Sequence, residues 1–542
     1  MKSLAGIIHP ASRDEGGRPD SNKNRKSYGD MKSKYVLDMV HHNPGEPRYD
    51  SRYNDPAVLK AMGYNGKVYS LFESPVLAVD WNAVEPGLFN GESEAWREEL
   101  AGRLKREFQN CKKQGLSVFA MSDMVLFPKK LVEKYGEGAT FGDVSNPFSI
   151  KYLKVLIDLI FTQFPEMDGL VVRIGETYLH DAPYHVGLIK DKCDAQKTIA
   201  PLVRLLRDEI CVKHDKELIF RTWAAFDEDL DAYLYVSEAV QPHEKLTIAI
   251  KHCEQDFHRG NRFSRIIGHG GHKQLIEVQC SREYEGKGAY PNYLAHGIIH
   301  GFEEHKADGL PSIGEFVKNK PELFAGIWTW TRGGGWEGPY IDNEFWPDLN
   351  AWILAQWSLD TTKTEKELFN DYATARMNLT PVDADRFHEL CLLSEKAIIR
   401  GKNTLLGKLN PWWSRDEYIG IPDLPPVEVD RFLEEKAEAV AMWKEIVRLG
   451  SEIRFPDVET GHFIQVSSQY GLCIYQIYEV VFNLKAGKCS SELIDQYDQA
   501  WDNLEKLKLD PACPTLYDRA LVRRLPDLTP ANELVEKYRN KK

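Results

Sequence analysis

The chain has 542 residues, a net charge of −13 and 42% hydrophobic residues. This length exceeds what one small core supports, so it predicts roughly two to four folding units, or one large barrel with an appended domain. The composition excludes a wholly disordered chain. The acidic balance argues against nucleic acid and anionic membranes as partners, because no basic surplus is available to neutralise phosphates. The 13 Trp, 24 Tyr and 23 Phe suit a core, or a cleft whose flat rings stack on sugars.

The N-terminus and the cysteines bear on location and on metals. The nine cysteines include no CxxC pair, which predicts neither a disulfide framework nor a zinc site, and their odd number indicates reduced thiols. The apolar start is broken by His9 and Pro10 and makes a poor signal peptide. No uncharged run reaches the length of about 18 residues that a membrane span needs. We therefore expect a cytoplasmic protein, although a secreted or periplasmic chain trimmed of its leader has the same appearance.

Residues 1–34 are rich in Gly, Asp, Asn, Lys, Arg and Ser, and they predict a flexible tail. After this tail, short apolar runs alternate with amphipathic helical patterns. One helical pattern spaces its apolar positions by four, four, four and three; these are Trp96, Leu100, Leu104, Phe108 and Cys111. The strand-like runs cover residues 35–40, 68–72, 116–121, 169–174, 217–223, 246–250, 274–278 and 324–330.

Strands that alternate with helices and are continuously apolar predict a parallel sheet covered on both faces. Eight such repeats in roughly 300 residues favour a closed barrel over an open sheet. The predicted fold class is therefore α/β, with a (β/α)8 TIM barrel over residues 35–358. From residue 359 the strand signal fades, and we expect a mostly helical C-terminal domain over residues 359–542.

Two apolar stripes recur at helical spacing in this C-terminal part. They form core, which is the preferred interpretation, or an oligomer face, which predicts a homodimer through the helical domain. The first stripe is Leu433, Ala437, Val440, Trp443 and Val447, and the second is Leu493, Tyr497, Trp501 and Leu504.

In a (β/α)8 barrel the reacting groups lie at the C-terminal ends of the strands. Three predicted strands are followed by acids, namely Glu176, Asp256 and Glu283. A lone acid there is usually a salt bridge or a helix cap, but three acids accompanied by Lys251 and Arg259 favour a site. Glycoside hydrolysis uses such a set, because one acid protonates the leaving oxygen and a carboxylate opposite activates water or attacks. The basic side chains suit a substrate that carries its own carboxylate, which Lys251 and Arg259 would hold.

These segments resemble, in chain order over about residues 165–380, the α-glucuronidases of glycoside hydrolase family 67. The family's fourth strand ends in a Ser-Glu-Gly-like turn, and GLVVRIGET is similar, with Gly175 before Glu176. Its fifth strand carries a Trp-Arg-aromatic element, and RTWAAF, starting at Arg221, is similar but permuted. IKHCEQDFH keeps the family's Lys and Asp-Phe at Lys251, Asp256 and Phe257 but lacks its Gly-Pro. LIEVQCSREYEGKG is similar to the seventh strand and keeps Glu277, Gln279, Glu283, Tyr284 and Gly286.

The resemblance implies an inverting glycosidase. Glu176 would be its general acid, and Asp256 with Glu283 would orient and deprotonate the water. Lys251 would contact the uronate carboxylate, and Arg221 would contact substrate. The family's N-terminal α/β domain has no counterpart, since the first strand begins near Tyr35.

Further substrate contacts are expected from the ends of the first, second and eighth strands. His42 follows the first strand, where it would bind sugar hydroxyls; a metal is not expected there, because neighbouring histidines on an extended chain point to opposite faces. Trp81 follows the second strand as a stacking platform. Trp330 of the eighth strand is either a platform or core, and Arg332 is a second candidate anchor for a carboxylate.

The sequence thus predicts an exo-acting glycosidase that releases a terminal acidic sugar, with α-linked glucuronic acid as first expectation, from an oligosaccharide. It needs no cofactor and no metal, because acid, base and water suffice. Three alternatives stay open. They are the same barrel acting on a neutral glycoside or another linkage, a catalytically silent carbohydrate-binding barrel, and a lyase or isomerase, which usually holds a metal or a cofactor.

Overall fold

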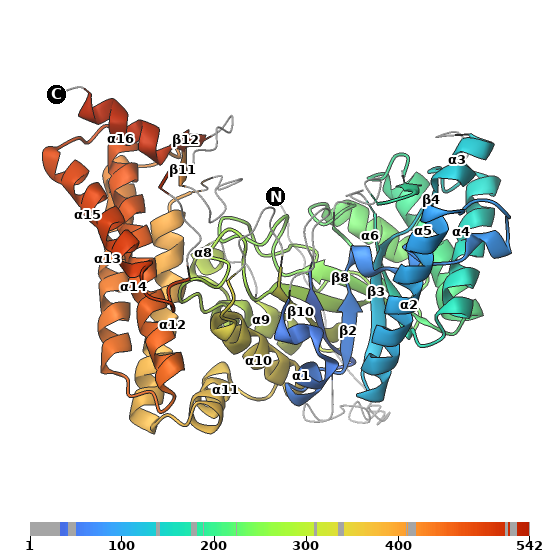
Figure 1. Ribbon diagram of the computed structural model, residues 1–542, viewed down its shortest axis with the longest axis horizontal. Coiled ribbons are helices and arrows are strands. Elements are labelled where there is room, and N and C mark those ends of the chain that lie inside the picture. Colours follow the sequence, from blue (N-terminus) through green and yellow to red (C-terminus); the bar gives the residue numbers. More distant parts are fainter. Residues whose placement is uncertain are drawn as a thin grey trace, which may run out of the picture.

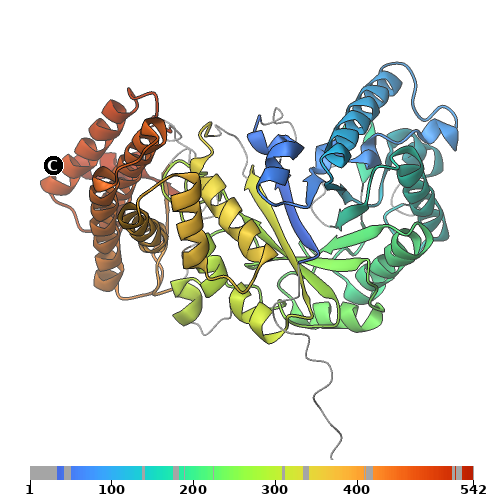
Figure 2. The same cartoon turned by 90° about the horizontal axis from the view of Figure 1, so that it is seen from below.

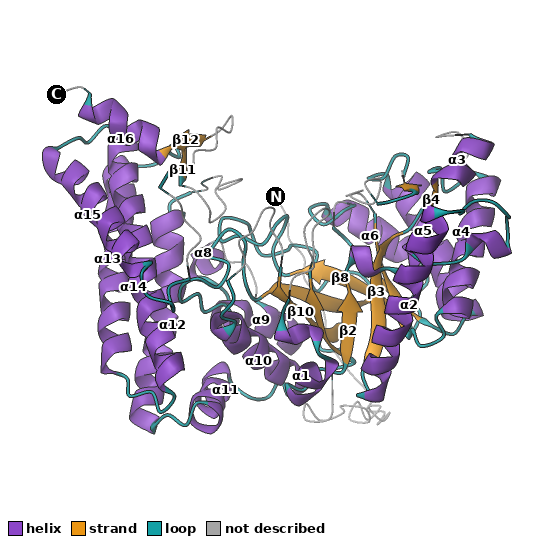
Figure 3. Ribbon diagram, in the orientation of Figure 1, coloured by secondary structure: helices purple, strands orange, loops and turns teal. Residues whose placement is uncertain are grey.

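The computed structural model confirms the predicted barrel. Eight parallel strands close in the order β1-β10-β9-β8-β7-β5-β3-β2, with helices around them (Figure 3). The strands are β1 (Tyr35–Val40), β2 (Gly66–Tyr69), β3 (Ser117–Asp123), β5 (Gly169–Arg173), β7 (Glu217–Arg221), β8 (Leu246–Lys251), β9 (Lys273–Gln279) and β10 (Phe324–Arg332). The structure describes residues 33–41, 50–136, 141–174, 182–187, 189–223, 225–307, 312–333, 341–407, 409, 419–514, 519–520 and 528–540.

Each of the eight predicted strands overlaps an observed one. The largest shift is at β2, which begins two residues before the predicted run and stops at Tyr69. It stops there because Leu71–Glu73 forms a 3-10 turn instead of extended chain. Every strand residue of β1 and β10 is buried, as expected for strands covered on both faces.

The helices that cover the barrel form where the sequence combines a cap with an apolar stripe. α4 shows both, because the Asn146 side chain accepts from the Phe148 N–H, Pro147 occupies the first turn, and Leu153, Leu156 and Ile160 face inward. The helices up to the last strand and just beyond it are α1 (Pro56–Ala61), α2 (Glu92–Lys113), α3 (Lys129–Tyr135), α4 (Pro147–Gln163), α5 (Ala200–Leu206), α6 (Leu230–Ala239), α7 (Ala295–His300), α8 (Glu303–Ala307), α9 (Ile313–Asn319) and α10 (Phe345–Leu359).

The chain after α10 is mostly helical and stands to one side of the barrel (Figures 1 and 2). Trp443 and Tyr475 pack there with ring centroids 5.0 Å apart. Four of the five residues in the first predicted stripe are buried or half-buried, whereas Ala437 is exposed, and the second stripe also faces inward. These stripes are therefore core. The helices are α11 (Glu365–Asp371), α12 (Pro381–Lys402), α13 (Val429–Glu452), α14 (Val458–Lys485), α15 (Ser491–Leu507) and α16 (Ala531–Arg539).

Two small antiparallel pairs were not expected from the sequence. β4 (Leu126–Pro128) pairs with β6 (His185–Gly187) beyond the ends of β3 and β5, and β11 (Gly420–Pro422) pairs with β12 (Leu528–Pro530) beside the C-terminal helices. Strands of three residues are too short to show a hydrophobic period. Within the described ranges, no helix is both long and apolar enough to cross a membrane.

Asp38 of β1 is a buried acid outside the predicted site. It is 1% exposed, and Thr329 Oγ1 donates to its Oδ1 at 2.7 Å. Its other oxygen, Oδ2, is buried and accepts no hydrogen bond among the described residues. Burial, partly offset by the threonine hydrogen bonds, raises the pKa of Asp38 from 3.8 to about 6.

We expect Asp38→Asn to remove a pH dependence of stability. The native state binds more protons than the unfolded state between about pH 4 and pH 6, so stability falls as the pH rises through this window. Between pH 4 and pH 7 the free energy of unfolding of the wild type should fall by about 2–3 kcal/mol relative to that of Asp38→Asn. Thermal unfolding of both proteins across this range measures the difference. The comparison with the variant is needed because the pKa of buried His185 is lowered to about 4, which makes the free energy of unfolding rise with pH. If the free energies of unfolding of the two proteins changed with pH in parallel, the raised pKa of Asp38 would be contradicted.

Candidate active site at the barrel mouth

Asp256 lies in a tightly bonded loop that follows β8. Its backbone oxygen accepts from the His258 N–H at 2.9 Å and from the Asn261 side-chain amide at 2.7 Å. The preceding residue, Gln255, has a φ of 57°, a left-handed conformation that is uncommon for a residue with a Cβ. Such local strain clusters at functional sites, where the surrounding structure holds it in place.

Two side chains orient the Asp256 carboxylate, which is 20% exposed. Tyr284 Oη donates to Oδ2 at 3.0 Å, and Lys251 Nζ lies 3.3 Å from Oδ1. The two partners come from different strand ends, because Lys251 is the last residue of β8 and Tyr284 follows β9. The arrangement fixes a partly solvent-accessible carboxylate at the mouth of the barrel.

Lys251 is held on several sides. Its Nζ lies 3.2 Å from the ring centroid of Trp223 and 4.8 Å from that of Phe257, which are cation–π distances. It also donates to the Gln255 carbonyl at 3.2 Å. Only 6% of the Lys251 side chain is exposed, and its contact with a substrate carboxylate stays a prediction.

Glu283 is 7% exposed and directly precedes Tyr284 in the chain. The loop that carries it is fastened by Arg282, whose Nη2 lies 2.7 Å from His252 Nε2 and whose Nη1 donates to Glu285 at 3.2 Å. Burial and the nearby Arg282 lower the pKa of His252 well below its usual value. His252 is therefore neutral and accepts the arginine proton through Nε2. The structure thus brings the Asp256 and Glu283 segments together through Tyr284.

Two of the predicted site residues, Glu176 and His42, lie outside the described residues. Their neighbours in the chain are placed. Ile174, just after β5, is buried, and His41, just after β1, stacks on Trp330 with ring centroids 5.0 Å apart. Gly333, which has a φ of +85°, ends β10 next to His41, where an added Cβ would lie 2.0 Å from the His41 oxygen. Only glycine fits at this bend.

Arg259 and Arg332 do not occupy the place expected of carboxylate anchors. Arg259 is 3% exposed, and its guanidinium binds the Glu304 carboxylate and the Glu395 carbonyl, so it joins the barrel to α12. Arg332 is 1% exposed and lies 3.6 Å from Glu344. Each of these two guanidinium groups is paired with a glutamate of the protein, because a buried charge is costly without a partner. Substrate binding by Arg259 or Arg332 stays a prediction, and either guanidinium would have to share or break its existing ion pair.

Two other predicted substrate contacts, both aromatic, are buried. Trp81 is fully buried between Phe127 and Tyr152, so it cannot be a stacking platform. Trp330 is 7% exposed and already covered by His41 and by the Arg221 guanidinium, which favours the core interpretation.

Arg221 forms a bidentate ion pair with Glu277 of β9 inside the barrel. Its Nε donates to Oε1 at 2.8 Å and its Nη2 donates to Oε2 at 2.7 Å, and both side chains are 1% exposed. The predicted contact between Arg221 and substrate would require this buried ion pair to open. The Arg221 guanidinium also packs against Trp330, since its central carbon lies 5.1 Å from the centroid of that ring.

Three residues without a predicted role also lie at the barrel mouth. Trp223 supports Lys251, and Asp123 and Arg173, the last residues of β3 and β5, form an ion pair with Nε 2.7 Å from Oδ1. Asp123 follows the predicted strand by two positions, which is the same signal that selected Glu176. A search of all eight strand ends for acids would have found it.

A cleft of about 400 Å³ adjoins the Asp256 loop. Gln255, which precedes Asp256, and Arg259 of the same loop line it together with Glu228 and residues 404–407 beyond α12. Segments from the barrel and from the C-terminal helices therefore share one concave surface beside the candidate carboxylate. Another cavity, of about 670 Å³, lies between the start of α10 and the C-terminal helices.

No protein-family model matches the sequence, and no curated protein matches it. Several solved structures align with it. A family GH115 4-O-methyl-α-glucuronidase with specificity for decorated arabinogalactans is 13% identical, with a TM-score of 0.49, over 92% of this chain and 63% of that chain. A GH138 enzyme targeting pectin rhamnogalacturonan II is 16% identical, with a TM-score of 0.46, over 88% of this chain and 63% of that chain.

A mutant O-GlcNAc hydrolase from Thermobaculum terrenum is 9% identical, with a TM-score of 0.43, over 95% of this chain and 94% of that chain. The chain thus spans 63% of the length of the GH115 and GH138 structures. The assignment of the barrel follows from the strand pairing alone. Any assignment of chemistry depends on the side chains at its mouth.

Proposed function

We propose that the protein is a glycoside hydrolase whose water-activating carboxylates are Asp256 and Glu283. One observation carries the proposal: the partly exposed Asp256 carboxylate is held at the C-terminal barrel mouth by Tyr284 and Lys251. A general base needs this combination of fixed geometry and solvent access. An oriented carboxylate that accepts one hydrogen bond on each oxygen keeps lone pairs available for a water molecule.

The proposed general acid is Glu176, which follows β5 by three positions. In an inverting mechanism it would protonate the leaving oxygen while Asp256, supported by Glu283, removes a proton from the attacking water. The sugar would then leave with inverted configuration at its anomeric carbon. No cofactor enters this scheme. Glu176→Gln should lower turnover by orders of magnitude without changing the fold, and near-normal activity of that variant would refute this role.

An α-linked glucuronic acid at the end of an oligosaccharide is the proposed substrate. Lys251 Nζ carries three protons, of which one is directed to Gln255 and one to Asp256. The third could contact a substrate carboxylate. The same pairing favours a second candidate, a neutral terminal sugar, because Lys251 is already neutralised by Asp256.

A panel of matched glycosides separates these candidates. Purified full-length protein is incubated with α-glucuronides and with the corresponding α-glucosides, and the released sugars are quantified by chromatography. Release from the glucuronides alone supports the acidic substrate. Release from the glucosides alone supports the neutral candidate, and release from neither contradicts the proposal for these linkages.

Tyr284→Phe tests the orientation of Asp256. The variant loses the hydrogen bond to Oδ2, which is worth about 1.5–3 kcal/mol when the acceptor is charged. We therefore expect kcat to fall by roughly 10- to 100-fold with little change in KM, as measured by steady-state kinetics. Tyr233→Phe is the matched control, because this buried tyrosine bonds the His269 carbonyl away from Asp256. An equal fall in kcat for both variants would contradict a specific role for Tyr284.

A further inference from the structure

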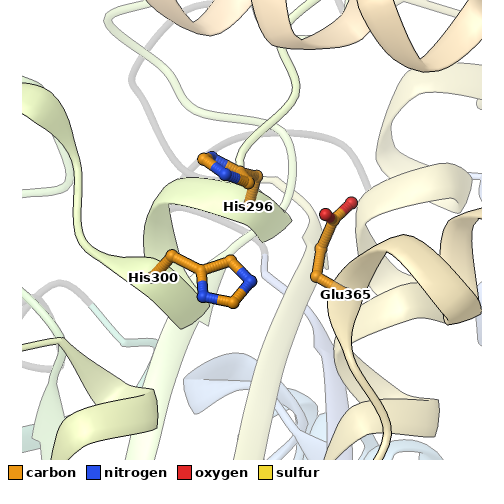
Figure 4. Close-up of side chains that lie close together, drawn as sticks. All are labelled: His296, His300 and Glu365. Carbon is orange, nitrogen blue, oxygen red and sulfur yellow. The ribbon is translucent and has the colours of Figure 1, made fainter.

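Three potential metal ligands converge on the outside of the barrel, on helices that do not carry Asp256 or Glu283. His296 and His300 are four residues apart in α7 and so share one face of the helix. Glu365 is the first residue of α11 and points toward them (Figure 4). One ligand atom of each residue lies within 4.8 Å of the other two.

Further side chains already orient these ligands. His296 Nδ1 lies 3.0 Å from the Glu395 carboxylate of α12, which leaves its Nε2 as the ligating nitrogen. Glu365 accepts from Tyr293 and lies 3.1 Å from His388 Nε2. Histidines that bind metals almost always donate their other ring nitrogen to a carboxylate or carbonyl, as His296 does here.

The cluster combines a buried carboxylate with two more accessible imidazoles. Glu365 is 2% exposed, whereas His296 is half-buried. His300 is the exposed member, so the cluster opens to solvent on one side.

We propose that His296, His300 and Glu365 bind one zinc-class divalent cation. Two imidazoles and one carboxylate suit zinc, and three protein ligands leave a fourth position for water. Tetrahedral zinc places its ligand atoms about 3.3 Å apart. The present ligand atoms lie within 4.8 Å of one another, so binding of the ion would draw these side chains closer together. The ion would fasten α7 to α11 and, through Glu395, to α12. The site is independent of the proposed hydrolysis, because it uses none of its carboxylates.

Isothermal titration of the full-length, chelator-treated protein with Zn²⁺ tests the proposal, with Mg²⁺ as the hard-cation comparison. We expect one Zn²⁺ per chain and no measurable Mg²⁺ binding. Glu395→Gln should weaken Zn²⁺ binding by roughly 10- to 100-fold, as the loss of an orienting partner does. His300→Ala removes a ligand and should weaken it more. His269→Ala is the matched control, since His269 is an exposed histidine outside the cluster.

The outcomes are separable from those of the glycosidase assays. Absence of Zn²⁺ binding by the wild type overturns the metal site and leaves the hydrolase proposal unaffected. Equal binding by the wild type, His300→Ala and Glu395→Gln also overturns it, since another site would then hold the ion. Because His300 is exposed, its variant should fold, and circular dichroism verifies this before titration.

Discussion

Asp256→Asn is expected to lower kcat by about 10³-fold on the best substrate of the glycoside panel, within the usual range for loss of a general base. The asparagine keeps the size of the side chain and can still accept the Tyr284 hydrogen bond, so binding and folding should persist. What disappears is the anionic oxygen that removes a proton from water. Steady-state kinetics with product quantification measures kcat and KM for wild type and variant.

The control for this experiment is Glu228→Gln. Glu228 is an exposed carboxylate that lines the cleft beside the Asp256 loop and bonds Gln255 at 2.9 Å. Glu228 lies close to the site but takes no part in the proposed chemistry. The kcat of Glu228→Gln should therefore remain near that of the wild type. If the kcat of Asp256→Asn equalled that of Glu228→Gln, a role of Asp256 as general base would be contradicted.

Arg221→Met is expected to destabilise the barrel by about 3–5 kcal/mol, because it leaves the Glu277 carboxylate buried without its partner. The double variant Arg221→Met/Glu277→Met should recover much of this loss, since no uncompensated charge remains inside the barrel. Equilibrium urea unfolding followed by tryptophan fluorescence compares the wild type, the single variant and the double variant.

Arg448→Met provides the matched control for the ion pair. Arg448 bonds Glu445 and Glu452 on the exposed surface of α13, where solvent screens the charges. The urea concentration at the unfolding midpoint of Arg448→Met should equal that of the wild type. A midpoint of Arg221→Met that is equally unchanged would contradict the assignment of Arg221 and Glu277 as a stabilising pair.

The barrel could be predicted because its signals are local. Continuous apolar runs and helical stripes are properties of neighbouring residues, and each predicted run overlaps a strand of the closed barrel. The position of Asp256 could be predicted for the same reason, since it lies in the loop that follows β8. Its tyrosine partner, 28 positions away, was noticed only as part of the family resemblance.

The pairings of the predicted substrate-binding arginines could not be read from the sequence. Arg221 was assigned to substrate through the family resemblance, and Arg259 was assigned to it because a cation beside a strand end suggests an anionic ligand. Their partners are instead Glu277 and Glu304, which lie 56 and 45 positions away in the chain. Pairings over such separations depend on how the strands and helices close in space, which hydrophobic periodicity does not encode. Trp81 was misplaced because an aromatic ring suits a core and a sugar platform equally well.

The same limit applies to the outer cluster. The spacing of His296 and His300 is visible in AHGIIH, but their acidic partner Glu365 follows 65 positions after His300 and depends on the docking of α11. Of the predicted catalytic acids, Asp256 and Glu283 are placed on neighbouring loops, and the role of Glu176 remains a proposal based on its distance from β5.

Proton NMR of the reaction during its first minutes tests the central claim most directly. The purified protein is mixed with an α-linked glucuronide oligosaccharide, and the anomeric signals of the released sugar are followed before mutarotation. The proposed inverting mechanism predicts β-configured glucuronic acid as the first product, and Asp256→Asn should abolish its release. First release of the α-anomer would contradict inversion, and no release from any glycoside of the panel would contradict the proposed activity on these linkages.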